Sequence, residues 1–167
     1  RLVEDLLMLS TLENSSAPPA LEEIDVGAMV QAIAAEARTL SHGRHEIDTR
    51  LETDMRLRGA PTEIESALRN LVTNAIRYTP DGGRIALAWR IRGDEGWLSV
   101  SDTGIGIAAE HLPRLTERFY RIDSRRSRRL RGTGLGLAIV KHILRRHQGH
   151  LAIQSSVGSG STFAVFL

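Results

Sequence analysis

The sequence contains no cysteine, which excludes both a disulfide-stabilised scaffold and a metal site built from thiolates. No apolar run approaches the roughly 18 residues of a membrane span, and the chain does not open on the pattern of a signal peptide. Of the 167 residues, 41% are hydrophobic and 25% are charged. This composition predicts one globular domain that is large enough to bury a core.

Lysine is almost absent, since Lys141 is the only one, and the basic charge comes from arginine. Eight arginines fall between Arg114 and Arg131, a run that occurs in nucleic-acid-binding segments. Aromatic residues, which such proteins use to stack on bases, are scarce here: only Phe119 and Tyr120 accompany the run. We therefore expect no nucleic-acid partner, and a basic loop near a polyphosphate explains the arginines equally well.

The chain divides at a short break near its start. Leucines at helical spacing in residues 1–14 predict the end of an amphipathic helix, and "SSAPPA" at residues 15–20 predicts a linker. Residues 21–167 form the main domain. A helix of this length cannot bury its apolar stripe alone, so it either belongs to a helical bundle or docks on the main domain.

The main domain alternates between strand and helix patterns. Helices are expected over residues 26–40, 61–79 and 134–147, with Asp25 as a cap and Pro61 opening the second helix. An irregular segment is expected from about 106 to 132. Strands are expected over residues 21–25, 45–51, 55–59, 83–92, 96–102, 150–155 and 161–167. The fold class is α/β (α+β): a two-layer α/β sandwich, in which one mixed sheet carries helices on one face.

A glycine-rich stretch, "LRGTGLGLAIV" at residues 130–140, precedes the last helix. Gly132, Gly134 and Gly136 alternate at its start, where glycine permits close approach of the backbone to another group. The N-terminus of a helix is also a site for anions, above all phosphate. A tight turn before a helix is an equally good interpretation of this stretch alone.

Polar residues follow one face of the helix expected over 61–79. Asn70, Asn74 and Arg77 stand at positions i, i+4 and i+7, whereas Ile64 and Leu68 lie on the other side. An amide oxygen suits Mg²⁺, which keeps several waters and shares the phosphates of a nucleotide. Either asparagine alone is explained as a solvated polar position.

Asp102 follows an apolar strand in "VSDTGIGI". A buried carboxylate there needs hydrogen-bond donors, and the amino group of adenine is one such donor. The alternative is an ordinary Asp-Thr-Gly turn. "GIGIAA" followed by Asp123 also has the form of a dinucleotide-binding fingerprint, but Pro113 and the arginine-rich segment interrupt the helix and strand that the fingerprint requires.

Four segments in order carry a resemblance: "NLVTNAIRYT" (70–79), "DTGIGI" (102–107), "ERFYRID" (117–123) and "GTGLGLAIV" (132–140). Residues 21–167 resemble the ATP-binding catalytic domain of sensor histidine kinases, within the gyrase, chaperone and MutL-like ATPase superfamily. "PRLTERFYRID" is particularly similar to phosphate-regulon sensor kinases. The resemblance implies a Bergerat-type ATP-binding fold, preceded in residues 1–14 by a short fragment of a dimerisation helix.

The resemblance also implies roles for individual residues, with ATP and Mg²⁺ as the ligands. Asn74 would hold Mg²⁺, and Asp102 would accept a hydrogen bond from the adenine amino group. Asn70 and Arg121 would be catalytic, with Arg121 neutralising the γ-phosphate during transfer. The residues implied to bind the nucleotide are Asn70, Asn74, Arg77, Tyr78, Asp102, Gly104, Gly106, Ile107, Tyr120, Arg121, Gly132, Thr133, Gly134, Leu135, Gly136, Leu137 and Thr162.

Residues 108–131 would form a mobile lid over the nucleotide, with Phe119 and Tyr120 anchoring its packing. Two positions depart from the family's pattern. Thr116 stands where a phenylalanine is usual, which weakens the apolar anchor of the lid. Ala60 stands where an aspartate usually precedes the long helix, so a capping role there is lost or moved to another group.

The implied activity is that of an ATP-dependent protein-histidine kinase. Relatives that hydrolyse ATP carry a glutamate at the position of Asn70, and an amide cannot act as a base at neutral pH. We therefore expect the site to deliver phosphate to an external nucleophile by positioning and charge neutralisation. A non-catalytic nucleotide-sensing or partner-docking module of the same fold is the alternative. A serine-directed kinase of the anti-sigma type is disfavoured by Asn70.

The phospho-acceptor histidine is expected upstream of Arg1, in the dimerisation domain. "HEID" at His45 superficially resembles an acceptor box but falls on an expected strand, and His142 and His147 are expected at a helix surface. The implied partners are the dimerisation domain and a response regulator, in phosphate-regulon signalling. The parent protein is expected to be a homodimer in the bacterial inner membrane, with this cytoplasmic fragment making no direct membrane contact.

Overall fold

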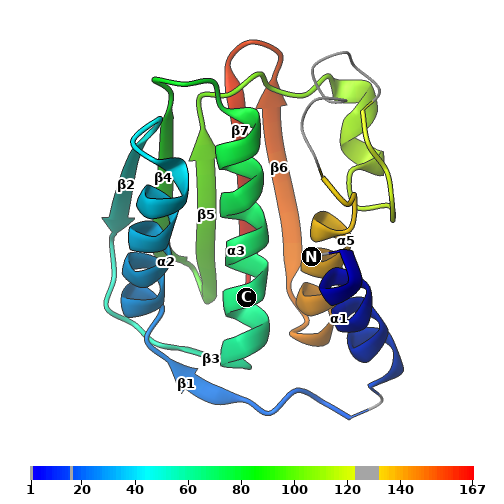
Figure 1. Ribbon diagram of the computed structural model, residues 1–167. Coiled ribbons are helices and arrows are strands. Elements are labelled where there is room, and N and C mark those ends of the chain that lie inside the picture. The colour runs from blue at the N-terminus through cyan, green and yellow to red at the C-terminus, as the bar shows by residue number, and fades with distance from the viewer. Residues whose placement is uncertain (1, 16, 123–131) are drawn as a thin grey trace.

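The computed structural model describes residues 2–15, 17–122 and 132–167. It contains two layers, because helices α2 (Val26–Ser41), α3 (Pro61–Tyr78) and α5 (Gly136–Arg146) cover one face of a five-stranded sheet (Figure 1). Helix α1 (Leu2–Asn14) lies beside α5. The two-layer α/β architecture predicted from the sequence is confirmed.

The large sheet is mixed. Its strands are β2 (Glu46–Leu51), β4 (Arg84–Arg92), β5 (Glu95–Asp102), β7 (Gly160–Phe166) and β6 (His150–Ser156), in that spatial order. β2 and β4 are parallel, and every other neighbouring pair is antiparallel. The carboxyl end of β5 therefore lies beside the amino end of β7, where Asp102 is paired with Ser161.

The prediction of a single sheet is wrong for the two shortest strands. β1 (Glu22–Ile24) and β3 (Leu57–Gly59) pair with each other in a separate antiparallel sheet. β1 leads into α2 and β3 leads into α3. The small sheet therefore joins the N-terminal ends of these two helices, at the lower edge of Figure 1.

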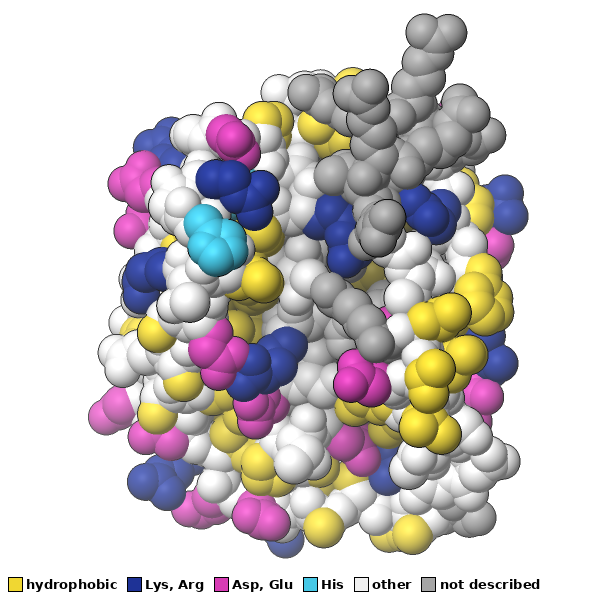
Figure 2. Space-filling view, in the orientation of Figure 1, with side chains coloured by type: hydrophobic (Ala, Val, Ile, Leu, Met, Phe, Trp, Pro, Cys, Tyr) yellow, Lys and Arg dark blue, Asp and Glu magenta, His cyan; other side chains and the backbone are white. Residues whose placement is uncertain are grey.

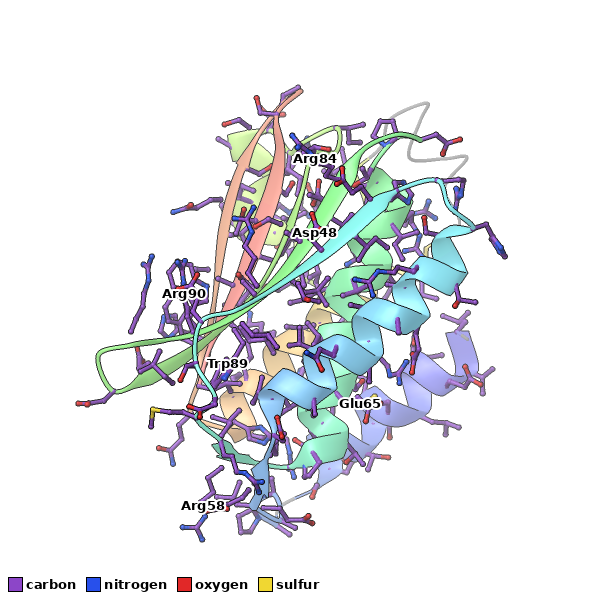
Figure 3. All side chains as sticks on the ribbon, turned by 90° about the vertical axis from the view of Figure 1, so that its left-hand side faces the viewer. Asp48, Arg58, Glu65, Arg84, Trp89 and Arg90 are labelled. Atoms are coloured by element: carbon purple, nitrogen blue, oxygen red, sulfur yellow. The ribbon has the colours of Figure 1, made fainter. Side chains whose placement is uncertain are left out.

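Alternation along the strands separates the core from the open face of the sheet. In β4, Ile85, Leu87 and Trp89 are buried, and Trp89 points toward the helices while its neighbour Arg90 lies on the opposite side (Figure 3). Such period-two alternation is typical of a sheet with one covered face. The apolar face of α3 packs onto these residues, as predicted: Ile64 and Leu68 are buried. Each such side chain stabilises the fold by roughly 1.5–3 kcal/mol.

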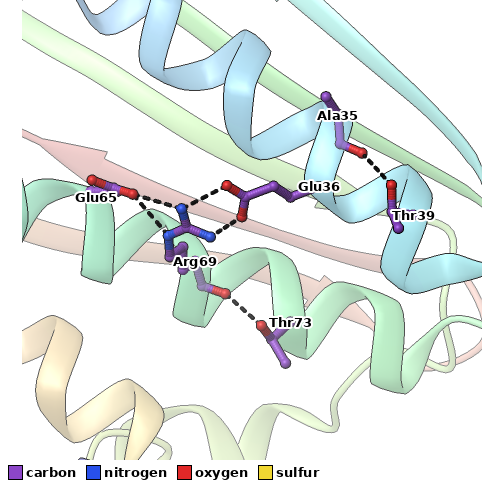
Figure 4. Close-up of polar contacts among 6 residues, drawn as sticks. All are labelled: Ala35, Glu36, Thr39, Glu65, Arg69 and Thr73. Carbon is purple, nitrogen blue, oxygen red and sulfur yellow. Dashed lines mark hydrogen bonds and ion pairs between the residues drawn. The ribbon is translucent and has the colours of Figure 1, made fainter.

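An arginine links α2 and α3 on the outer surface (Figure 4). The Arg69 Nη2 atom lies 2.6 Å from Glu65 Oε1 and 2.8 Å from Glu36 Oε1, and Nη1 also pairs with Glu36. All three side chains are exposed, so each pair contributes no more than about 1 kcal/mol. The cluster joins the outer surfaces of α2 and α3 one residue before Asn70.

The helix caps agree with the sequence at one helix and differ at the next. Asp25 caps α2, because its Oδ1 accepts the Ala28 N–H at 2.9 Å. α3 opens at Pro61 without a side-chain cap, and instead the Ala60 N–H donates to His147 Nε2 at 3.0 Å. The expected surface position of His147 is wrong: its side chain is only 4% exposed, because the ring fills the space between α5 and the start of α3.

Candidate functional site

A cavity of about 580 Å³ opens between α3, the start of α5 and the segment that follows β5. Its size is typical of small-molecule sites. Most of the residues predicted to bind a ligand line it together: Asn70, Asn74, Arg77, Tyr78, Asp102, Gly106, Ile107, Tyr120, Arg121, Gly132, Thr133, Gly134, Gly136 and Leu137. Segments that are far apart in the sequence, from Asn70 to Leu137, thus converge on one cavity.

Three predicted residues lie outside the lining. Gly104 lies directly behind the wall, where its N–H contacts Asp102. The Leu135 side chain is buried in the core between two cavity-lining glycines, and Thr162 bonds to Ser101 through their hydroxyl groups at 2.9 Å. The lid predicted over residues 108–131 falls in part on residues 123–131, which are outside the described residues.

The carboxylate of Asp102 lies at one end of the cavity. Its Oδ1 accepts the Gly104 N–H at 2.8 Å. Burial raises the pKa of Asp102 above its ordinary value of 3.8, and hydrogen bonds from the Gly104 and Ser161 N–H groups oppose this rise. A carboxylate that is desolvated and still faces a cavity has capacity to accept a hydrogen bond from a ligand.

Two glycines are required to close this end of the cavity. Gly106 has φ +68°, and a Cβ there would lie 1.9 Å from the Ser156 carbonyl oxygen. Gly160 has φ +97°, and a Cβ there would lie 1.9 Å from the Asp102 carbonyl oxygen. Only glycine permits this approach of the segment after β5 to the turn between β6 and β7.

The opposite end of the cavity is polar and contains the start of α5. Asn70, Asn74 and Arg77 face it from α3, and Arg77 Nη1 lies 3.4 Å from Asn74 Oδ1. A Cβ at Gly136 would lie 2.8 Å from Asn70 Oδ1, so the backbone at the start of α5 passes directly over this amide. The N-terminal end of a helix carries partial positive charge, which together with Arg77 favours an anion.

The segment after the 3₁₀ helix η1 (Ala109–Arg114) forms a further wall. His111 Nδ1 and the Tyr120 hydroxyl are 2.8 Å apart, and the Arg114 guanidinium lies over the Tyr120 ring at 4.4 Å from its centroid. The anchoring role expected of the Phe119 ring is wrong, because this ring is 58% exposed. Phe119 adopts φ +60°, and its N–H bonds to the Gly134 carbonyl, so the backbone makes the contact.

Sequence reasoning missed three polar residues of the cavity, namely His111, Asp5 and Ser161. His111 has no partner at a recognisable spacing, and its contact with Tyr120 depends on the turn between them. Asp5 lines the cavity from α1, where its Oδ2 accepts a hydrogen bond from Thr133 Oγ1 at 2.7 Å. No sequence signal relates positions separated by 128 residues.

Histidines elsewhere have structural contacts. His45 is buried, and its Nδ1 and Nε2 lie 2.9 Å from Ser41 Oγ and from the Thr79 carbonyl oxygen. His142 was expected at the surface but is partly covered by α1, since its Nε2 lies 3.2 Å from Glu13 Oε1.

Within the described ranges, no helix has the length and apolarity to cross a membrane.

One cavity beside the mixed sheet is therefore surrounded by Asp102, by Asn70, Asn74 and Arg77 of α3, and by the alternating glycines before α5. Residues 59–167 match the model of the histidine kinase-, DNA gyrase B- and HSP90-like ATPases. The chain belongs to this ATPase family. Among its relatives, the phosphate regulon sensor protein PhoR of Pseudomonas aeruginosa is 48% identical, over 97% of this chain and 37% of the relative. The sensor-like histidine kinase SenX3 of Mycobacterium tuberculosis is 40% identical, over 99% of this chain and 41% of the relative.

Solved structures of this ATPase family agree with the sequence relatives. Full-length ShkA in complex with AMPPNP superposes with a TM-score of 0.87 at 26% identity, over 99% of this chain and 34% of that one. The Acinetobacter baumannii histidine kinase AdeS gives a TM-score of 0.79 at 28% identity, over 99% of this chain and 75% of that one. The chain is an ATP-binding catalytic domain of the histidine-kinase type, and it spans less than half of the two sensor proteins that it matches.

Proposed function

We propose that this domain binds ATP with Mg²⁺ in the cavity and transfers the γ-phosphate to a histidine of a separate dimerisation domain. The observation that carries the proposal is the placement of Asp102 at one end of a single cavity, with Asn74, Arg77 and the start of α5 at the other. An adenine nucleotide has the matching polarity: a hydrogen-bond donor at the base and negative charge at the phosphates.

Asp102 would recognise the base. Its carboxylate accepts the adenine amino group, while the Gly104 N–H fixes the orientation of the carboxylate from behind. A charge-assisted hydrogen bond of this kind contributes about 1.5–3 kcal/mol. Guanine presents a carbonyl oxygen at the corresponding position, which the carboxylate would repel, so the same residue provides selectivity.

Asn74 would hold Mg²⁺ through its Oδ1. The donor fits this ion, because Asn74 lines the cavity and its amide oxygen is an oxygen ligand of the kind that Mg²⁺ takes. Mg²⁺ is usually bound through one or two protein oxygens together with substrate phosphates and water. When bound, it neutralises phosphate charge and orients the γ-phosphate.

Phosphate transfer would rely on position and charge. Asn70 supplies an amide that cannot deprotonate water, and its Nδ2 is already bonded to the Ser66 carbonyl at 2.9 Å. Arg77 and Arg121 line the cavity, where their guanidinium groups would stabilise the charge on the transferring group. The bond from the γ-phosphorus to the bridging oxygen breaks as a bond to the acceptor imidazole nitrogen forms, and ADP leaves.

We further propose that residues 1–14 are the end of a dimerisation helix, that 15–20 are a linker and that 21–167 are the catalytic domain. The outward face of α1 supports this, because it exposes Leu2, Val3, Leu6 and Leu7 in a patch that is visible over α1 in Figure 2. The parent protein would be a homodimeric sensor kinase of the bacterial inner membrane that signals through a response regulator. Its similarity to PhoR supports phosphate-regulon signalling.

The test of this function is a transfer assay. The chain is mixed with γ-labelled ATP, Mg²⁺ and a separate helical bundle that carries the acceptor histidine of a related sensor kinase, with a bundle lacking that histidine as the control. We expect label on the first bundle only. No label on either bundle, with ATP binding intact, would favour the alternative of a non-catalytic nucleotide-sensing or docking module.

A further inference from the structure

Helix α1 packs tightly on the catalytic domain. Leu9 and Leu12 are buried at 3% and 8% exposure. The Ser66 hydroxyl donates to Met8 Sδ at 3.2 Å, and Arg146 Nη1 donates to the Ser15 carbonyl oxygen at 3.1 Å. One side of α1 is therefore part of the core between α3 and α5, while its opposite side is exposed.

Two acidic side chains of α1 contact the catalytic domain. Glu13 pairs with Arg118, in the segment between η1 and α5, and with His142 of α5. Asp5 reaches further, because its carboxylate lines the cavity and accepts the Thr133 hydroxyl at 2.7 Å, between Gly132 and Gly134. An acid in the first turn of a helix is ordinarily explained by the helix dipole, but Asp5 also makes this contact across to the glycine-rich stretch.

Asp5 would place a negative charge beside a polyphosphate bound in the cavity. Asp5 bonds to Thr133, and the neighbouring Gly132 lies against Arg77, since a Cβ there would be 2.9 Å from Arg77 Nη1. Asp5 is therefore beside the residues that we expect to face the phosphates. Two like charges in a partly desolvated site repel each other. At a separation of about 4 Å and an effective dielectric constant of about 20, the repulsion is about four times as strong as in bulk water. Asp5 also occupies the Thr133 hydroxyl, which would otherwise be available to a phosphate oxygen.

We propose that Asp5 couples the docking of α1 to nucleotide binding, so that docked α1 weakens the affinity for ATP and bound ATP weakens the docking of α1. The inference rests on the proposed binding of ATP in this cavity. The coupling is reciprocal by thermodynamic necessity, so each direction can be measured separately. The catalytic domain would thus sense whether α1 is docked.

The first experiment measures nucleotide affinity by calorimetry for the whole chain and for Asp5→Asn. Asparagine retains an oxygen that can accept the Thr133 hydroxyl and removes only the charge. We expect ATP to bind about 5- to 20-fold more tightly to the variant, ADP to gain less, and adenosine, which has no phosphate, to be unchanged. Asp94→Asn, in the exposed turn between β4 and β5, is the matched control and should change none of the three.

The outcomes of this experiment are decisive. Unchanged or weaker ATP binding to Asp5→Asn would overturn the proposal, since Asp5 would then be neutral to the phosphates or would assist them through Mg²⁺. An equal gain for adenosine would also overturn it, because the effect would not depend on phosphate charge. Asp102→Asn separates this result from the proposed function: if that variant binds ATP as well as the original chain does, the site assignment itself fails.

The second experiment follows α1 directly. Because the chain has no cysteine, Val3→Cys and Gln31→Cys introduce a unique pair of exposed sites for spin labels on α1 and α2. Saturating ATP should broaden the distance distribution in the original background and change it much less in Asp5→Asn. An unchanged distribution in the original background, with ATP bound, would contradict the reciprocal coupling.

Discussion

The Asp102 carboxylate accepts the Gly104 N–H at 2.8 Å, and a Cβ at Gly104 would lie only 2.6 Å from that same Asp102 oxygen. The two residues therefore depend on each other. The absence of a side chain at position 104 allows the backbone to orient the carboxylate, which in our account binds adenine. The same Cβ would lie 2.6 Å from the Tyr78 carbonyl oxygen, so the site and the end of α3 are fixed together.

Gly104→Ala should consequently reduce both stability and nucleotide affinity. The added methyl group forces the backbone away from Asp102 and Tyr78, at a cost of about 1–3 kcal/mol in the free energy of unfolding. Urea denaturation and calorimetry with ATP measure the two effects. Gly27→Ala is the control, because its Cβ would have no neighbour closer than 3.5 Å and alanine favours the helix. Equal stability of the two variants would contradict the crowding described at Gly104.

The raised pKa of Asp102 predicts a pH dependence of nucleotide binding. The ionised carboxylate accepts the adenine amino group, so affinity for ATP should fall as the pH drops through a value above 3.8. Protonation of the ATP phosphates also lowers the affinity in acid. Repeating the titration with adenosine, which has no phosphate, removes this contribution. The pH dependence with adenosine should vanish in Asp102→Asn, and its persistence in that variant would assign the titration to another group.

The same shift makes a prediction about folding. Because burial raises the pKa of Asp102 in the folded state, the folded protein binds this proton more tightly than the unfolded chain does. The group therefore lowers stability above its folded pKa, and this cost disappears as the pH falls below 3.8. Asp102→Asn should be slightly more stable than the original chain at pH 7 and lose that advantage in acid, as thermal unfolding at both pH values would show. A variant less stable at pH 7 would refute this.

His147 Nε2 accepts the N–H of Ala60, the residue immediately before α3, which has no side-chain cap. His147→Phe fills the same space but cannot accept the Ala60 N–H, so it should lower the free energy of unfolding by about 1–3 kcal/mol. Nucleotide affinity should hardly change, because His147 does not line the cavity. His42→Asn is the control, since this exposed C-cap position with φ 51° suits asparagine. Unfolding in urea distinguishes the two variants.

Asn74 is predicted to make ATP binding depend on Mg²⁺. In the presence of Mg²⁺, Asn74→Ala should reduce the affinity for ATP about 10-fold or more. The affinity should then approach that of the original chain when a chelator removes Mg²⁺. Asn14→Ala, on the exposed end of α1, serves as the matched control. If Asn74→Ala retains the full gain in affinity on adding Mg²⁺, another residue holds the metal.

The sequence predicts features that depend on local patterns. The 3.6-residue period and the start signals at Asp25 and Pro61 predict α2 and α3 to within two residues at each end. The polar stripe of α3 is correctly placed, because residues on one helix face necessarily lie together. The four motifs, which occur in the order typical of an ATPase family, also predict which segments lie together around the cavity.

Features that depend on contacts between distant segments were not predicted. The burial of His147 follows from the approach of α5 to Ala60, 87 residues away. The exposed ring of Phe119 follows from a left-handed backbone conformation, which sequence patterns do not indicate for phenylalanine. The contact of Asp5 with Thr133 requires α1 to dock on the main domain, one of two arrangements that the sequence left open.

In our proposal the cavity binds ATP with Asp102 at the base and with Asn70, Asn74 and Arg77 of α3 at the phosphates. Calorimetric titration of ATP and Mg²⁺ into the original chain and into Asp102→Asn tests it most directly. We predict a roughly 10- to 150-fold loss of affinity in the variant, the range expected for one charge-assisted hydrogen bond of about 1.5–3 kcal/mol. Equal affinity of the two proteins for ATP would contradict the account.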